Sequence, residues 1–145
     1  MKNLELPDYT DFFYDYLSVN YPQIASDRQF IHDRNILAQE TFLSTMKKCN
    51  DYDLANELAI DVLLKDYKFS KFYCVLDVLF DEYQALFTKD ILNSFALQFM
   101  PECEAIFGKY KLSDDFLRQS ALMDLKHELK SFIRDKMNEY WSFSV

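Results

Sequence analysis

The chain of 145 residues contains a single glycine, Gly108, and this scarcity constrains its fold more than any other feature. Motifs that cradle phosphates, bind dinucleotides or present a serine nucleophile on a sharp turn all need several glycines. Two-residue hairpins prefer Asn-Gly, Asp-Gly or Gly-Gly pairs, and none of these pairs occurs. Half of the residues are apolar, which is too many for intrinsic disorder. The sequence therefore predicts a folded, helical protein without a sheet.

Apolar residues recur at helical spacing in successive segments along the chain. The clearest segment near the C-terminus contains Leu122, Leu125, Leu129, Phe132, Ile133, Met137 and Tyr140. Short polar turns separate the segments, and nothing resembles a linker or an internal repeat. We therefore predict one compact all-α domain over residues 1–145, with six to eight helices and no sheet.

Several residues predict where helices begin and end. Pro7 suits the first turn of the first helix, and Tyr21-Pro22 predicts its end. The segment Ser26-Asp27-Arg28-Gln29 has the form of a capping box. Ser70 and Thr88 each suit the N-cap of a later helix.

The second half of the chain offers three more local predictions. The helix after Ser70 is expected to bury Val75, Leu76, Leu79, Phe80 and Tyr83. Pro101 predicts either a kink or a break, and we favour a break with the proline in the first turn of a new helix. Ser113, followed by two aspartates, predicts another helix start.

The three cysteines are widely spaced and form no CxxC pair. This spacing suits reduced thiols better than a disulfide framework or a structural zinc site. Cys74 and Cys103 flank apolar stripes and are expected to be buried, whereas Cys49 near a helix end is expected to be accessible. The two histidines, His32 and His127, fall on different predicted helices. We expect no metal and no cofactor.

No arrangement of side chains identifies a catalytic centre, so the chain is not expected to be an enzyme and no catalytic residue is assigned. The formal net charge of −8 disfavours binding to a phosphate backbone. We predict a non-catalytic helical binding or accessory module with an unidentified protein partner. A nucleic-acid-associated accessory protein and an enzyme of unrecognised type are the alternatives. The oligomeric state is left open.

The N-terminal sequence predicts neither a signal peptide nor a membrane anchor. Acidic residues occur where a signal peptide would need an apolar core. The longest stretches without Asp, Glu, Lys or Arg are 16–26 and 91–101, far shorter than a membrane-spanning helix of about 20 residues. We expect a cytoplasmic protein with no membrane partner.

Two turns combine lysines and an aromatic residue just before a serine. The predicted binding residues are Tyr67, Lys68, Ser70, Lys71, Lys109, Tyr110, Lys111 and Ser113. Because free N–H groups at a helix N-terminus favour anions, the two turns together would hold a phosphate or a carboxylate of a partner. The alternative is that both are capped turns with solvated lysines. A joint site requires the two turns to be close in space.

The order of these motifs resembles a known family. Its pattern is matched by Tyr21-Pro22, Phe30-Ile31, Glu57-Leu58-Ala59, Phe69-Ser70-Lys71, Leu79-Phe80-Asp81-Glu82, Lys109-Tyr110 and Leu112-Ser113-Asp114-Asp115-Phe116. The chain resembles an uncharacterised family of small helical Bacteroidetes proteins, a domain of unknown function, over roughly residues 9–133. The family typically has Trp at the position of Phe80 and Asn at that of Asp81. The resemblance implies an all-helical bacterial protein. Members of the family are often encoded near genes of mobile or conjugative elements. The resemblance supplies no catalytic residue and no cofactor.

Overall fold

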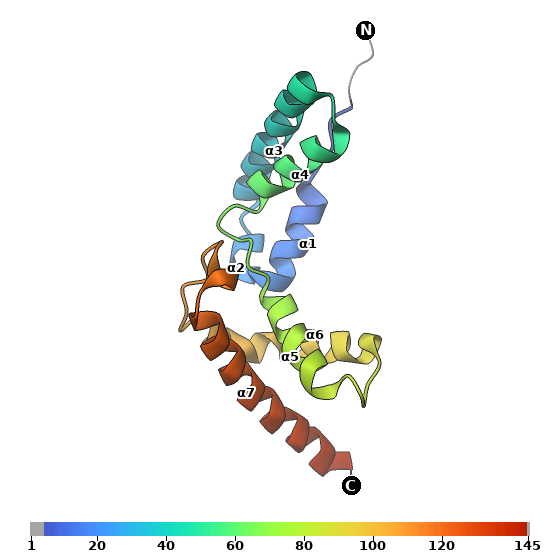
Figure 1. Ribbon diagram of the computed structural model, residues 1–145, viewed down its shortest axis with the longest axis vertical. Coiled ribbons are helices and arrows are strands. Elements are labelled where there is room, and N and C mark those ends of the chain that lie inside the picture. The colour runs from blue at the N-terminus through green and yellow to red at the C-terminus, as the bar shows by residue number, and fades with distance from the viewer. Residues whose placement is uncertain (1–4, 145) are drawn as a thin grey trace. The chain divides into compact units, whose positions relative to one another are not determined.

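The computed structural model describes residues 5–144, with side chains described up to Tyr140. Within this range the chain forms seven α-helices and one short 3-10 helix, and no strand (Figure 1). The predicted all-α class and number of helices are confirmed. The chain divides into two compact units, Met1–Lys68 and Phe69–Val145, and each is described by itself. A single domain over residues 1–145 stays a prediction.

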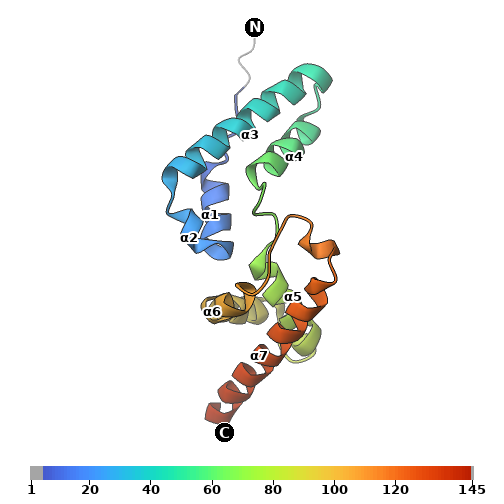
Figure 2. The ribbon, with the colours of Figure 1, turned by 90° about the vertical axis from the view of Figure 1, so that its left-hand side faces the viewer.

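The N-terminal unit contains α1 (Thr10–Asn20), α2 (Pro22–Ala25), α3 (Arg28–Cys49) and α4 (Tyr52–Leu63). α3 and α4 lie side by side and are joined by a two-residue turn (Figure 2). Its core consists of Tyr9, Phe13, Leu17, Ala25, Ile31, Ala38, Phe42, Ala55, Ala59 and Leu63. The α3–α4 hairpin therefore supplies most of the framework on which α1 packs.

The turn between α3 and α4 follows from its two residues. Asn50 has a φ of 50°, in the left-handed region that asparagine tolerates at the end of a helix. The carboxylate of Asp51 accepts a hydrogen bond from the N–H of Leu54 and caps α4. Asn50 thus ends α3 and Asp51 starts α4, and the turn between them contains no glycine.

The first helix begins later than Pro7 predicts. The carbonyl of Pro7 accepts a hydrogen bond from Nε2 of Gln39 at 2.8 Å. The N–H of Tyr9 donates to the buried Oδ1 of Asn35, also at 2.8 Å. These contacts to α3 hold residues 7–9 outside the helix, so α1 starts at Thr10. The predicted end of this helix before Tyr21-Pro22 is confirmed.

The N-cap of α3 is Asp27, one residue after the predicted Ser26. The carboxylate of Asp27 accepts from the N–H of Phe30 at 3.0 Å. The hydroxyl of Ser26 instead donates to the carbonyl of Gln23 at 3.2 Å, because Ser26 ends α2. A short helix between the proline and the cap thus shifts the capping position.

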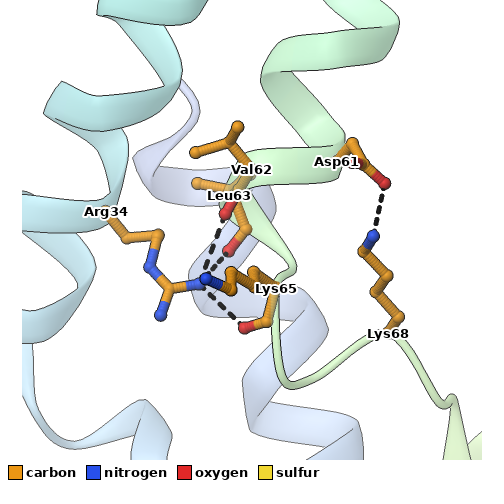
Figure 3. Close-up of polar contacts among 6 residues, drawn as sticks. All are labelled: Arg34, Asp61, Val62, Leu63, Lys65 and Lys68. Atoms are coloured by element: carbon orange, nitrogen blue, oxygen red, sulfur yellow. Dashed lines mark hydrogen bonds and ion pairs between the residues drawn. The ribbon is translucent and has the colours of Figure 1, made fainter. Parts of the chain in front are cut away.

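The C-terminal end of α4 is held by an arginine from α3. Nη1 of Arg34 lies 3.3 Å from the carbonyl oxygen of Val62, 3.2 Å from that of Leu63 and 2.8 Å from that of Lys65 (Figure 3). The last carbonyls of a helix lack partners within the helix, and a cation there also complements the helix dipole. The guanidinium additionally lies over the ring of Phe30, 4.8 Å from its centre. Arg34 therefore connects α3 to the end of α4.

We expect Arg34→Ala to lower the free energy of unfolding by about 1.5–3 kcal/mol, because half-buried carbonyls lose a charged donor. Urea unfolding of the full chain measures this change. Arg34→Lys should recover only part of the loss, since an ammonium group cannot reproduce the stacking of the planar guanidinium on the Phe30 ring. Arg28→Ala is the control, because the exposed side chain of Arg28 forms no hydrogen bond or ion pair with another described residue. A loss equal to that of this control would contradict the role assigned to Arg34.

The C-terminal unit contains α5 (Lys71–Tyr83), α6 (Lys89–Phe107), the 3-10 helix η1 (Phe116–Arg118) and α7 (Ala121–Ser144). Its core side chains include Phe69, Val75, Leu79, Leu92, Ala96, Phe99, Cys103, Phe107, Phe116, Leu125, Leu129, Ile133 and Met137. The hydroxyls of Ser70 and Thr88 accept from the N–H groups of Tyr73 and Ile91, so both predicted N-caps are confirmed.

Pro101 neither breaks α6 nor begins a new helix, contrary to the sequence prediction. A proline inside a helix leaves the carbonyl four residues earlier without its usual donor. Here that residue, Leu97, is 54% exposed and Pro101 is exposed, so water can reach the carbonyl. Core residues before and after the proline, such as Phe99 and Cys103, stay in register on one face. Packing of that face therefore maintains a continuous helix.

The predicted environments of the three cysteines are confirmed. Cys74 and Cys103 are 5% and 0% exposed, and Cys49 is exposed. Burial raises the pKa of both the Cys74 and the Cys103 thiol to about 12. Neither thiol is therefore a nucleophile at neutral pH.

We expect a thiol reagent to label Cys49 in the native protein, and Cys74 and Cys103 only after unfolding. Cys49→Ser should then abolish native labelling, which mass spectrometry of the labelled chain measures. Since the folded-state pKa of each buried thiol lies above the ordinary value of 9.0, their contribution to stability is present below pH 9 and is lost as the pH rises toward 12. Rapid native labelling of all three cysteines would contradict the assigned burial.

Candidate functional site

The residues of the first predicted turn fall in both units, with Tyr67 and Lys68 at the end of the N-terminal unit. The ring of Tyr67 packs edge-on against Tyr21 and Phe30, at centre distances of 5.1 and 5.7 Å. Its carbonyl accepts a hydrogen bond from the hydroxyl of Tyr16 at 2.6 Å. Lys68 forms an ion pair with Asp61 of α4 (Figure 3). Both residues thus have partners within their own unit.

Lys71 is buried, whereas the sequence suggested a solvated or ligand-binding lysine. Its side chain is 9% exposed and its ammonium group lies 3.1 and 3.2 Å from the two carboxylate oxygens of Glu104 on α6. The same ammonium lies 5.8 Å from the centre of the Phe107 ring. Lys71 is the first residue of α5 and directly follows the Ser70 cap, so its ion pair with Glu104 joins the start of α5 to the end of α6.

The second predicted turn contacts α7 through one carboxylate. The hydroxyl of Tyr110 donates to Oε1 of Glu128 at 2.9 Å, and Lys109 pairs with Oε2 at 3.2 Å. These two contacts hold the pKa of Glu128 below its ordinary value, and the hydrogen bond from the Tyr110 hydroxyl lowers it more than the contact with Lys109 does. Lys109 and Tyr110 therefore attach the loop after α6 to α7.

Ser113 does not start a helix, contrary to the prediction. Its hydroxyl donates to Oδ1 of Asp115 at 2.6 Å and accepts from Nε2 of Gln119 at 3.1 Å. The hydrogen bond from Ser113 is the main cause of a lowered pKa at Asp115. The local bonds stabilise a turn followed by η1, and the next α-helix begins only at Ala121. The helix N-terminus expected at this serine is absent among the described elements.

Aromatic packing brings the two turns together within the C-terminal unit. The ring of Phe69 lies 5.1 Å from that of Phe116 and 6.5 Å from that of Phe107. Tyr110 lies 6.1 Å from Phe116. Of the eight predicted binding residues, Lys111 alone has a side chain that forms no hydrogen bond or ion pair with the described part of the chain; its carbonyl accepts from the N–H of Ser113. An anion site shared by the turns stays a prediction, and their contacts within the chain give most of these residues a structural role.

The sequence missed the exposure of large apolar side chains on α5 and α7. Tyr73 is 62% exposed, Phe80 46% and Met123 71%. The prediction that Phe80 is buried is wrong, because Tyr73 and Phe80 are seven residues apart and share the outward side of α5. A helical projection of α5 centred on Val75 and Leu79 would have identified this outward side. We call Tyr73 and Phe80 the α5 apolar surface.

A shallow groove of about 200 Å³ lies between α5 and α7. It is lined by Val78, Asp81, Glu82, Met123, Lys126, His127 and Lys130. Glu82 pairs with Lys130 at 2.8 Å and with Arg134 at 3.1 Å, and the Lys130 contact is the main cause of its lowered pKa. The exposed His127 lies in this groove, and His32 is exposed on α3. The described residues contain no cluster of His, Cys, Asp and Glu suited to a metal ion.

None of the described helices has the length and apolar character required to cross a membrane.

The family described as Domain of unknown function (DUF1896) matches residues 2–141. The crystal structure of protein PG0816 from Porphyromonas gingivalis is similar, with a TM-score of 0.60 and 21% sequence identity over 91% of this chain and 90% of that chain. No curated protein matches the chain. The structural similarity supports the helical fold alone.

Proposed function

The chain belongs to the family described as Domain of unknown function (DUF1896), and we propose that it is a non-catalytic helical module that binds a protein partner. The observation that carries this proposal is the α5 apolar surface. Tyr73 and Phe80 expose aromatic side chains on one side of α5, although the other side of the same helix is buried in the core. Aromatic residues and methionine are enriched at protein interfaces, and a few such anchors supply most of the binding energy.

Charges around this surface favour a basic partner. Asp77 lies between Tyr73 and Phe80 on the outward side of α5, and Asp81 follows directly, both exposed. The whole chain carries a formal net charge of −8. Complementary charge accelerates association and suppresses wrong partners. We therefore infer a partner whose binding face combines an apolar anchor with Lys or Arg.

The internal pairing of lysines favours a protein partner over nucleic acid. Lys68, Lys71 and Lys109 each form an ion pair with a carboxylate of the same chain. Those cations are therefore partly neutralised before any phosphate approaches. A gel-shift titration at low salt tests the alternative, because binding to a phosphate backbone would weaken steeply as salt is added.

The non-catalytic part of the proposal is supported by the buried thiols, whose pKa values of about 12 leave them protonated. A screen of hydrolase and nuclease activities tests it. A turnover that one substitution at His32 or His127 abolishes would overturn it. We further propose a cytoplasmic role among the products of mobile or conjugative elements, which the family resemblance supports.

We expect Phe80→Ser to reduce capture of the specific partner by about tenfold or more, because an exposed aromatic anchor is lost. The measurement is affinity capture from the native host, with quantitative mass spectrometry of the bound proteins. Leu97→Ser is the matched control, since Leu97 is 54% exposed on α6 and lies outside the α5 apolar surface. Equal capture by the wild-type chain and Phe80→Ser would contradict this surface as the binding site.

A further inference from the structure

A pocket on the N-terminal unit has a different chemistry from the α5 apolar surface. It has a volume of about 320 Å³ and is lined by Thr10, Asp11, Tyr14, Arg28 and Ile31. The first three residues belong to α1 and the last two to α3. Pockets that hold small ligands range from about 300 to 1,000 Å³, so this pocket suits a small molecule.

Two opposite charges line this one pocket without pairing. Neither Asp11 nor Arg28 forms an ion pair or a side-chain hydrogen bond with another described residue, and their charged atoms are therefore more than 4.0 Å apart. Asp11 lies in the first turn of α1, where the helix dipole favours a carboxylate. Arg28 is the first residue of α3, where the dipole opposes a cation, which argues against a stabilising role for its charge.

The remaining lining is apolar or hydroxyl-bearing. Ile31 is 3% exposed and forms the buried part of the pocket, and the ring of Tyr14 is 45% exposed beside it. The hydroxyl of Tyr14 supplies a further hydrogen-bond donor and acceptor, whereas the hydroxyl of Thr10 already hydrogen-bonds to the carboxylate of Asp8. An apolar body of a ligand would therefore contact Ile31 and Tyr14, while its charged ends meet the two ionised side chains.

We propose that the α1–α3 pocket binds a small zwitterion with an apolar side chain, of the class of free amino acids. The guanidinium of Arg28 binds the carboxylate, because its planar fork matches two carboxylate oxygens. The carboxylate of Asp11 binds the ammonium group. The inference is independent of the proposed protein partner, because it concerns other residues in the other unit.

Titration of the full chain with L-phenylalanine, followed by NMR of labelled protein, tests the proposal. We expect saturable shifts in the amides of α1 and α3. L-phenylalanine amide lacks the carboxylate and 3-phenylpropanoate lacks the ammonium group, and each should bind about tenfold more weakly. An analogue with one charge that binds as tightly as the zwitterion would overturn the proposal. So would the absence of saturable shifts up to about 10 mM ligand.

Substitutions locate the two charges. Arg28→Gln and Asp11→Asn should each weaken binding of L-phenylalanine about tenfold. Asp15→Asn is the matched control for Asp11→Asn, because Asp15 is exposed one turn further along α1 and does not line the pocket. Arg118→Gln is the control for Arg28→Gln, since Arg118 is exposed in the other unit. Binding that survives both pocket substitutions, or that the controls reduce equally, would refute the assigned roles.

Discussion

Replacing Phe116 by alanine is expected to lower the free energy of unfolding by about 3–5 kcal/mol, the usual cost of truncating a buried phenylalanine. Phe116 is 1% exposed and contacts Phe69 before α5 and Tyr110 after α6. The substitution removes the ring on which both loops pack. Urea unfolding of the full chain, monitored by circular dichroism, measures the change.

The adjacent residue provides a close control. Leu117 belongs to the same 3-10 helix but is 66% exposed, so Leu117→Ala should change the unfolding free energy by no more than about 0.5 kcal/mol. If Phe116→Ala proves too unstable to measure, Phe116→Leu should show a smaller loss of the same sign. Equal effects of Phe116→Ala and Leu117→Ala would contradict the central position of the Phe116 ring.

Lys71→Glu is expected to lower the free energy of unfolding by about 2–3 kcal/mol. Breaking a fully buried ion pair costs about 3–5 kcal/mol, and the cost is smaller here because the side chain of Glu104 is 30% exposed. The substitution places a second carboxylate beside Glu104 and removes the cation over Phe107. Chemical unfolding at neutral pH is the measurement.

Lys111→Glu serves as the control, because it makes the same charge change at an exposed lysine whose side chain has no described partner. It should alter stability by no more than about 0.5 kcal/mol. The double variant Lys71→Glu with Glu104→Lys should recover part of the loss by restoring opposite charges. A stable Lys71→Glu protein would indicate that Lys71 is not structural, and would return it to the candidate binding residues.

The two predicted binding turns contain contacts that the sequence can predict and contacts that it cannot. The serine cap at Ser70 could be predicted because capping depends on a side chain and the N–H three residues later. The partners of Lys71 and Lys109, by contrast, are 33 and 19 residues away in the chain. A lysine beside an aromatic residue has the same sequence pattern whether a ligand or a distant carboxylate neutralises it.

The same distinction explains the errors at Ser113 and Pro101. Ser113 followed by two aspartates is a valid helix-start signal, but its hydroxyl bonds to Asp115 and Gln119 and stabilises a turn instead. Pro101 has a real local preference to break a helix, and packing of α6 on both sides of it outweighs that preference. The burial of Phe80 was mispredicted because an apolar residue at a stripe's edge can lie on either side of it.

The sequence by itself determined the all-α class, the caps at Ser70 and Thr88 and the burial of Cys74 and Cys103. These features depend on backbone preferences and on apolar spacing, which act between residues a few positions apart. Only the tertiary structure decided which cations are neutralised within the chain, which apolar side chains remain exposed, and that Asp11 and Arg28 share one pocket. Those features depend on which helix faces meet, and that is set by the free energy of packing the whole core rather than by any single segment.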